Sequence, residues 1–252
     1  MDTRALLLVL ASAVIHAVWN TMLAGARDSR AATNLALLVG TLLLVPPAIV
    51  TWEIDADVVP FAIASGTMQV AYVFLLGVAY DHAPLSSVYP VARGSAPVVV
   101  LALSFSLDRH PAAIGAVGAV LVGAGILGLR GLGRRGLVYG LAIGVLLGSI
   151  TTIDQFGVKH ASTFSYLLLI VAPAAIVTVV QEIVRGRAGV LRAEVTGRTL
   201  VAGVGFMTTY VLILAALRLA PAASVAAVRE VSIVIAVVLG ALVLREPVTS
   251  RR

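Results

Sequence analysis

The sequence predicts an all-α fold: a polytopic membrane helix bundle of nine transmembrane helices, built as inverted five-helix repeats of which the second lacks its last helix. Three observations predict it. Hydrophobic residues make up 60% of the chain and charged residues 12%, with a mean hydropathy of +1.05, whereas soluble domains are about 25% charged. The apolar residues form runs long enough to cross a bilayer, and part of the first half recurs in the second.

Apolar runs of about twenty residues, the length that a helix needs to cross ~30 Å of hydrocarbon, are separated by charged or proline-bearing gaps. The first run is predicted to be an uncleaved span and not a signal peptide, because it continues through His16 and Trp19 and further spans follow. The longest gap, from Arg185 to Arg198, is too short for a soluble domain. The predicted spans lie near 5–24, 31–51, 58–80, 84–107, 112–129, 137–157, 163–184, 199–219 and 221–244.

An internal repeat relates the two halves of the chain. YVFLLGVAYDHAPLSSVYPVARGSAPVVV, from Tyr72, aligns with YVLILAALRLAPAASVAAVREVSIVIAV, from Tyr210, with one residue dropped in the connecting turn. Weak similarity of this kind is typical of the inverted repeats that build alternating-access transporters. The predicted repeats are residues 1–130, with five spans, and 137–252, with four. A tenth span is therefore expected after Arg252, and either a shortened sequence or a genuine nine-span form explains its absence.

The basic residues predict an orientation. Twelve of them lie in one set of alternating gaps and four in the other, so the positive-inside rule places the C-terminus in the cytoplasm and the N-terminus outside. The predicted location is the plasma membrane. The formal net charge of +6 does not indicate a nucleic-acid partner, because these residues lie in short gaps between spans.

Several function classes are excluded. The chain has no cysteine, which rules out disulfides, thiolate nucleophiles and cysteine metal sites. No nucleophile–base pair, metal-ligand set or paired-aspartate motif is evident, so we predict neither an enzyme nor a cofactor.

Two adjacent charges, Arg229 and Glu230, interrupt the last apolar run, SVAAVREVSIVIAVVLGALVL. Arg229 lies eight residues past Pro221, which at 1.5 Å per residue is ~12 Å deep in a ~30 Å core. Arg93, nine residues past Pro84, reaches a similar depth in the paired helix. Ionisable residues within the membrane are by default a functional-site hypothesis. The alternative is a buried polar network that fixes helix packing.

Other polar residues extend the candidate site. Asp154, near the end of the sixth span, either pairs with one of the two arginines or lies at a solvated helix end. His16 and Asn20 are four residues apart and so share a helix face, next to Trp19. Further candidates for a polar lining are Gln69, Tyr72 and Tyr89, for which interhelical hydrogen bonds or interfacial positions are the alternative.

At these residues the sequence resembles the EamA-like family of the drug/metabolite transporter superfamily. The likeness rests on HAVWN (16–20), VYPVARGSAP (88–97), TIDQFGVK (152–159) and VREVSIVIAVVLGALVLREPV (228–248). The resemblance implies two inverted five-helix repeats and export or exchange of metabolites, amino acids or drugs through a central cavity. By position it implies that Arg93, Arg229 and Glu230 face the cavity, flanked by Trp19 and Asp154.

The resulting hypothesis is a secondary transporter of a small anionic or zwitterionic metabolite, with Arg93 and Arg229 as counter-charges. Glu230 and Asp154 are the candidates for carrying a coupling proton. Efflux of cationic drugs, in which these two acids attract the cargo, is one alternative. A non-transporting membrane assembly subunit is the other. The sequence does not indicate the substrate, the transport direction or the oligomeric state.

Overall fold

The computed structural model describes residues 1–107, 117, 133–232 and 235. Seven helices in these ranges are long and apolar enough to cross a membrane, which confirms seven of the predicted spans. They are α1 (Thr3–Ala24), α2 (Ser29–Val50), α3 (Val59–His82), α4 (Leu85–Ser106), α6 (Arg134–Gly157), α7 (Thr163–Val184) and α9 (Gly197–Leu219). The predicted span 112–129 lies outside the described residues, except for Val117.

Three short helices complete the described chain: η1 (Ala56–Val58), α8 (Ala188–Ala193) and α10 (Ala222–Arg229). The last of these forms the beginning of the predicted span 221–244, most of whose remaining residues are not described. Helix starts follow local chemistry. Asp28 caps α2 by accepting from the Ala31 N–H, and Ser162 caps α7 in the same way.

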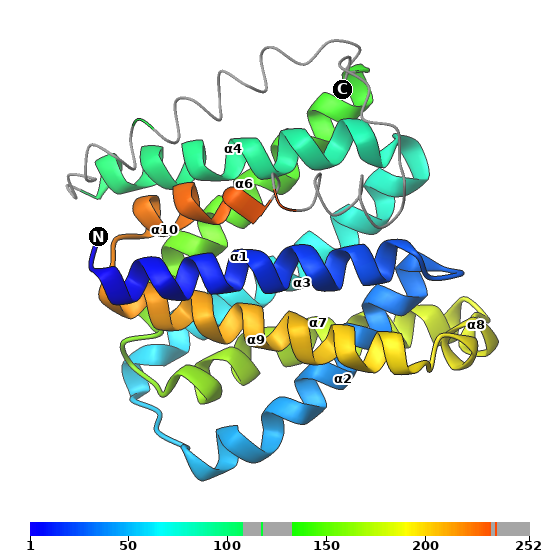
Figure 1. The fold of residues 1–252 in the computed structure, drawn as a ribbon, viewed down its shortest axis with the longest axis horizontal. Coiled ribbons are helices and arrows are strands. Elements are labelled where there is room, and N and C mark those ends of the chain that lie inside the picture. The colour runs from blue at the N-terminus through cyan, green and yellow to red at the C-terminus, as the bar shows by residue number, and fades with distance from the viewer. Residues whose placement is uncertain (108–116, 118–132, 233–234, 236–252) are drawn as a thin grey trace.

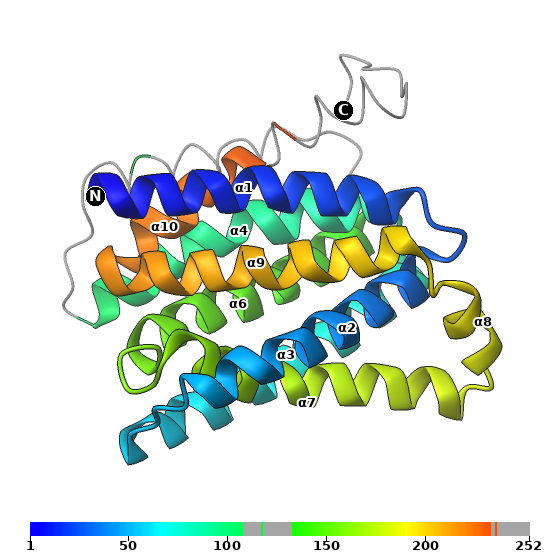
Figure 2. The same cartoon turned by 60° about the horizontal axis from the view of Figure 1, so that its bottom comes forward.

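The helices of the two halves interleave in pairs. α1 lies along α9 and α6 lies along α3, while α4 packs on α6 and α10 on α1. The long contact of α1 with α9 is visible in both views (Figures 1 and 2). α2 contacts α9 and α7, and α3 also contacts α7. Each half therefore packs mainly against the other.

Glycines allow the close approach of α4 and α6. A Cβ atom added at Gly148 would lie 2.7 Å from the Cβ of Val99 and 2.8 Å from the carbonyl oxygen of Ala96. Gly140, two turns away on α6, faces Val91 in the same way, at 2.5 Å. In lipid no hydrophobic effect drives helices together, so their association depends on close van der Waals packing. Small residues at the contact allow this packing.

Residues 25–30 and 185–198 meet at one end of the bundle, which we call the basic end. The Asp28 carboxylate lies 2.6 Å from the Arg187 guanidinium, and the Asp28 N–H donates to Glu194 at 2.9 Å. Figure 1 shows α8 at this end, beside the turn that follows α1. Both segments belong to the set of gaps that carries most of the basic residues.

The opposite end is held by backbone pairing between the α2–α3 and α6–α7 connections. Ile54 and Ala161 form an isolated antiparallel bridge. The Asp55 N–H donates to the His160 carbonyl at 2.8 Å. The described connections thus alternate between the two ends, because each spanning helix carries the chain from one end of the bundle to the other.

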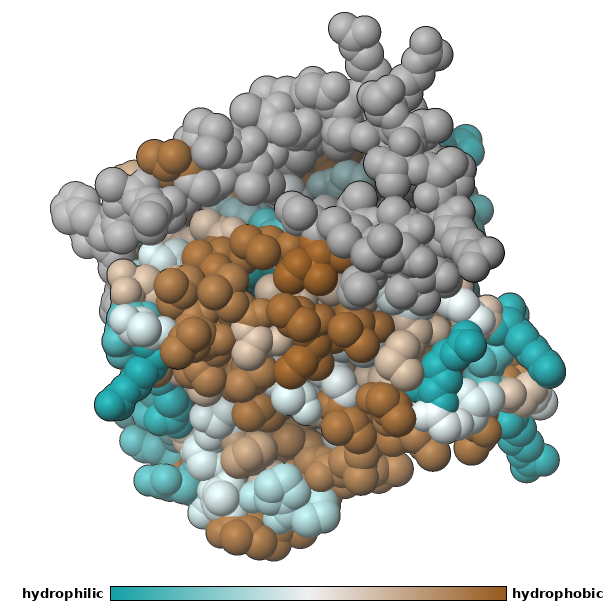
Figure 3. All heavy atoms as spheres, in the orientation of Figure 1, coloured by the Kyte–Doolittle hydropathy of each residue, from teal (hydrophilic) through white to brown (hydrophobic). Residues whose placement is uncertain are grey.

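The outer surface suits lipid. Leu42, Ile49, Val50 and Ile63 expose between 60% and 84% of their area on α2 and α3. In Figure 3 apolar side chains cross the middle of the visible face, and hydrophilic ones gather at its two ends. This distribution matches a hydrocarbon layer bounded by water.

Candidate functional site

A cavity of about 440 Å³ lies between the two halves, within the usual range for small-molecule sites. Eight of the predicted site residues line it: His16, Trp19, Asn20, Gln69, Tyr72, Tyr89, Arg93 and Arg229. Ala24, Ser29 and Arg30 also line it, and the first two are exposed at the basic end. The cavity therefore runs from the two arginines to the basic end of the bundle.

Arg93 is held by α4 with only 6% of its surface exposed. Its Nη2 atom lies 2.6 Å from Nε2 of His16 and 3.4 Å from the Ser232 hydroxyl. The guanidinium also lies 5.8 Å from the centre of the Tyr89 ring, within the range of a cation–π contact. These contacts orient Arg93 without neutralising it.

Arg229 ends α10 and lies over the Tyr210 ring, with 6.0 Å between its guanidinium carbon and the ring centre. In the described part of the chain, neither Arg229 nor Arg93 has a carboxylate oxygen within 4.0 Å. Two cations thus line one cavity within the bundle, and neither is paired with an acid there.

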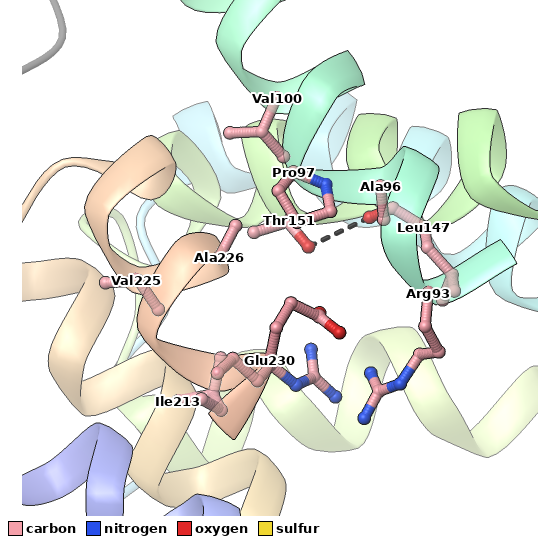
Figure 4. Close-up of a pocket in the computed structure, with 11 residues that line it drawn as sticks. Arg93, Ala96, Pro97, Val100, Leu147, Thr151, Ile213, Val225, Ala226 and Glu230 are labelled. Atoms are coloured by element: carbon pink, nitrogen blue, oxygen red, sulfur yellow. Dashed lines mark hydrogen bonds between the residues drawn. The ribbon is translucent and has the colours of Figure 1, made fainter. Parts of the chain in front are cut away.

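Glu230 lies beside the cavity and not on its wall. It lines a smaller space of about 20 Å³ together with Arg93 and Arg229, which is roughly the room one water molecule needs. Figure 4 shows Arg93 and Glu230 pointing into this space from α4 and from the end of α10. Arg229 and Glu230 do not form a close pair, as expected for adjacent residues about 100° apart on a helix.

Polar atoms without partners gather here. Of five buried side-chain atoms that lack a hydrogen bond in the described residues, four belong to the site: His16 Nδ1, Arg93 Nε, Arg229 Nε and Glu230 Oε2. Leaving a buried polar group unsatisfied costs about 1–3 kcal/mol. This concentration makes the region the best candidate for a ligand-binding site among the described residues.

Aromatic residues form the walls. Trp19 donates to the Thr209 hydroxyl at 3.3 Å and meets His16 edge-on, with ring centres 5.0 Å apart. Gln69 donates to the Tyr210 hydroxyl at 2.8 Å. Thr209 and Tyr210 were not predicted, although the alignment of Tyr210 with Tyr72 offered a signal for the latter.

Residues 134–252 match the EamA-like transporter family. The second part of the chain is thus similar to this family. The predicted resemblance is thereby confirmed, and with seven described helices of membrane-spanning length the chain is a multi-pass membrane protein.

Solved structures bear on the fold alone. A crystal structure described only as "Crystal structure of protein" superimposes with a TM-score of 0.70 at 16% identity, over 100% of this chain and 92% of the other. No curated protein sequence matches the chain. This likeness shows a fold shared over the whole chain.

Asp154 lines neither of the two cavities. It is 2% exposed and accepts hydrogen bonds from Ser65 at 2.6 Å and from Tyr166 at 2.8 Å. It is therefore not a solvated helix end, and no described arginine lies within 4.0 Å of it. Its bonds join α6 to α3 and α7, towards the end opposite the basic one.

A network of ion pairs at the basic end was not predicted from the sequence. Glu182, fully buried on α7, lies 3.2 Å from Arg30 Nε and 2.7 Å from Arg187 Nε, and Asn34 donates to it at 3.3 Å. A carboxylate inside the predicted span 163–184 was the available signal. Hydrogen bonds from Arg187 to Glu182 and Asp28 raise the pKa of Arg187.

Asp28 completes this network from the α1–α2 connection. Partial burial raises the pKa of its carboxyl, but hydrogen bonds from the Ala31 N–H and from Arg187 outweigh burial and lower the pKa below the ordinary value. The ionised form is therefore favoured at the helix N-terminus, where a negative charge is also stabilised by the helix dipole.

One group of described side chains has the spacing of metal ligands. Asp55, Asp57 and His160 place one ligand atom each within 4.8 Å of one another, at the end opposite the basic one. Both acids are exposed, and the group lies at the other end of the bundle from the cavity mouth. Nothing connects it with the site.

Proposed function

We propose that the chain is a secondary active transporter that carries a small anionic or zwitterionic metabolite, such as an amino acid or organic acid, by alternating access. The observation that carries this proposal is the pair of arginines on one cavity, Arg93 buried and Arg229 half-buried, with no carboxylate oxygen within 4.0 Å of either among the described residues. Buried charges in proteins are normally paired. A substrate carboxylate or phosphate supplies the missing partner.

We further propose that residues 1–130 and 137–252 are inverted repeats. Matching the described spans of the halves in order relates α1, α2, α3 and α4 to α6, α7, α9 and α10. The contact of α1 with α9 then exchanges with that of α6 with α3, and the contact of α2 with α9 exchanges with that of α7 with α3. The contacts of α1 with α10 and of α6 with α4 exchange likewise. A two-fold relation produces this pattern. It makes α4 equivalent to α10 and aligns Arg93 with Glu230, one residue after Arg229.

The orientation of the bundle follows from its basic end. The positive-inside rule places this end in the cytoplasm, and with it the mouth of the cavity. The described conformation is then the inward-facing state, in which the site is loaded from the cytoplasm. The bonds from Ser65 and Tyr166 to Asp154 lie on the closed, outer side.

Glu230 is the preferred candidate for a coupling proton, because it shares a small space with both arginines. Ionised, it offsets part of their positive charge across this space without a direct ion pair. A bound substrate carboxylate would supply that negative charge instead and favour protonation of Glu230. Proton flux that accompanies substrate flux in the parent protein, but not in Glu230→Gln, is the expected result.

Export of cations is the less favoured function. It requires acids on the cavity wall, whereas Asp154 lines neither cavity and already accepts two hydrogen bonds. The cavity wall itself carries cationic groups, with Arg30 at the mouth in addition to Arg93 and Arg229.

Uptake into proteoliposomes tests the proposed function, with a panel of amino acids, organic acids and phosphonates. Arg229→Ala should abolish most of the flux. Arg192→Ala, which removes an exposed arginine from α8, is the control and should leave the flux unchanged. If Arg229→Ala transports every substrate as well as the parent protein does, Arg229 is not a counter-charge.

A further inference from the structure

The contact between His16 and Arg93 fixes the tautomer of the histidine. The two atoms, His16 Nε2 and Arg93 Nη2, lie 2.6 Å apart. A guanidinium has five N–H donors and no acceptor, so His16 Nε2 has to accept with its lone pair. The imidazole is therefore neutral and carries its hydrogen on Nδ1.

That Nδ1–H group donates no hydrogen bond within the described structure. It is buried, and no hydrogen-bond partner lies near it. His16 lines the large cavity, and its ring orientation is held by Trp19 as well as by Arg93. A histidine with only a packing role would gain nothing from an unsatisfied N–H group beside a cavity, because such a group costs free energy.

Two more bare donors accompany it. The Nε–H groups of Arg93 and Arg229 are also buried without partners, and both residues line the same cavity. Glu230 Oε2, in the small space beside them, is an acceptor without a partner among the described residues. The set therefore offers three donors and one acceptor, from α1, α4 and the end of α10.

We propose that His16 is a substrate-binding residue, held by Arg93 in the tautomer that donates from Nδ1, and that the site takes a small carboxylate which also carries an N–H or O–H donor. This inference rests on the proposed function. The carboxylate receives the three N–H groups, and the donor of the ligand points towards the small space that Glu230 shares with the two arginines. Amino acids and hydroxy acids have both parts, while simple carboxylates and amino acid amides each lack one.

Binding can be measured without transport, through the fluorescence of Trp19 on the cavity wall. The chain has two tryptophans, and the second, Trp52, is 54% exposed. A Trp52→Phe background leaves Trp19 as the single indole. The probes are leucine, 2-hydroxy-4-methylpentanoate, 4-methylpentanoate and leucinamide, whose side chain suits the aliphatic wall at Leu23 and Leu37.

Leucine and the hydroxy acid should bind in the millimolar range or tighter. The other two should bind at least about tenfold more weakly, because each leaves charged buried groups unpaired. Equal binding of all four probes, or binding of none, would overturn the proposal. This comparison needs no variant of His16, so it stands even where a substitution disturbs folding.

Two substitutions separate the nitrogens of His16. The amide of His16→Asn places an N–H near the Nδ1 position, whereas that of His16→Gln reaches the Nε2 position and leaves Nδ1 without a replacement. His16→Asn should bind leucine within about threefold of the parent protein, and His16→Gln about 10- to 100-fold more weakly. Unchanged binding in His16→Gln, or equal loss in both variants, refutes the role of Nδ1.

The same experiments distinguish failure of the inference from failure of the proposed function. A protein that binds leucine with this dependence on His16 but shows no flux in proteoliposomes is not a transporter. One that transports leucine equally well with glutamine at position 16 is a transporter whose site does not use His16. Far-ultraviolet circular dichroism of each variant, which reports helix content, confirms that the bundle is intact.

Discussion

Arg93 and Arg229 line the same cavity from opposite halves of the chain, and each guanidinium lies about as far from a tyrosine ring as the other, at 5.8 Å from Tyr89 and 6.0 Å from Tyr210. They differ in their remaining contacts. Arg93 has hydrogen bonds to His16 and Ser232, whereas no hydrogen bond of the Arg229 side chain is found in the described residues. Arg229 is therefore the residue at which a ligand-binding role and a packing role can be separated.

Replacing Arg229 by methionine should weaken binding of the transported anion by about 10- to 100-fold, since a charge-assisted contact is lost. Thermal stability in detergent without substrate should stay unchanged or rise, because an unpaired, half-buried charge is replaced by an apolar side chain of similar length. Binding and melting temperature are measured on the same preparation. A drop in melting temperature with unchanged binding would instead support a network that fixes helix packing.

Tyr166→Phe removes one of the two hydrogen bonds to Asp154 at the end opposite the basic one. We expect a loss of about 1–2 kcal/mol in stability, because the carboxylate stays buried with only Ser65 as a donor. The resulting decrease in melting temperature is measured by circular dichroism. Tyr139→Phe on α6 is the matched control, and a decrease of similar size there would show that any lost tyrosine hydroxyl has this effect.

The contact of α4 with α6 depends on the absence of a side chain at Gly148. Gly148→Ala places a Cβ against Val99 and the Ala96 carbonyl, and forcing such a contact in a packed interface costs about 1–3 kcal/mol. Gly189→Ala on α8, where nothing lies within 4 Å of an added Cβ, should not destabilise the protein. Equal melting temperatures for the two variants would mean that the helices can move apart freely.

The spans were predictable because length and apolarity are local properties. The starts of the helices that carry the two arginines were also predictable, from the prolines Pro84 and Pro221 that precede them. Each of these features depends on one continuous segment of the sequence. The structure places Arg93 and Arg229 on one cavity.

Tertiary partners were not predictable in this way. The partners of Asp154 are Ser65 and Tyr166, single neutral residues on two other helices. The wall residue Phe206 looks the same in sequence as Phe74, which is 56% exposed on the outer face. Membrane helices are apolar on all sides, so hydrophobic periodicity does not tell the inner face from the outer one.

The contact of Asp28 with Arg187 should make stability depend on pH. The pKa of Asp28 is lowered in the folded protein, so its stabilising effect is present above the ordinary value of 3.8 and is lost as the pH falls through the lower folded value. Asp28→Asn keeps the cap on α2, since asparagine caps equally well. The variant should melt below the parent protein at pH 7, and the difference should shrink as the pH falls below 3.8. A difference that does not shrink in acid would mean that the charge of Asp28 is not its source.

The orientation of the bundle can be tested with single cysteines, because the chain has none of its own. Ser29 lies at the cavity mouth at the basic end, and Asp57 is exposed at the opposite end. In intact cells a membrane-impermeant maleimide should label Asp57→Cys and leave Ser29→Cys unlabelled, because the positive-inside rule places the basic end in the cytoplasm. In inside-out vesicles the two should exchange. Labelling of Ser29→Cys in intact cells would place the basic end outside and reverse the inferred side from which the cavity is loaded.

Excess amino acid or hydroxy acid in the vesicle assay should slow labelling of Thr33→Cys, which lines the cavity, but not that of Arg192→Cys on α8.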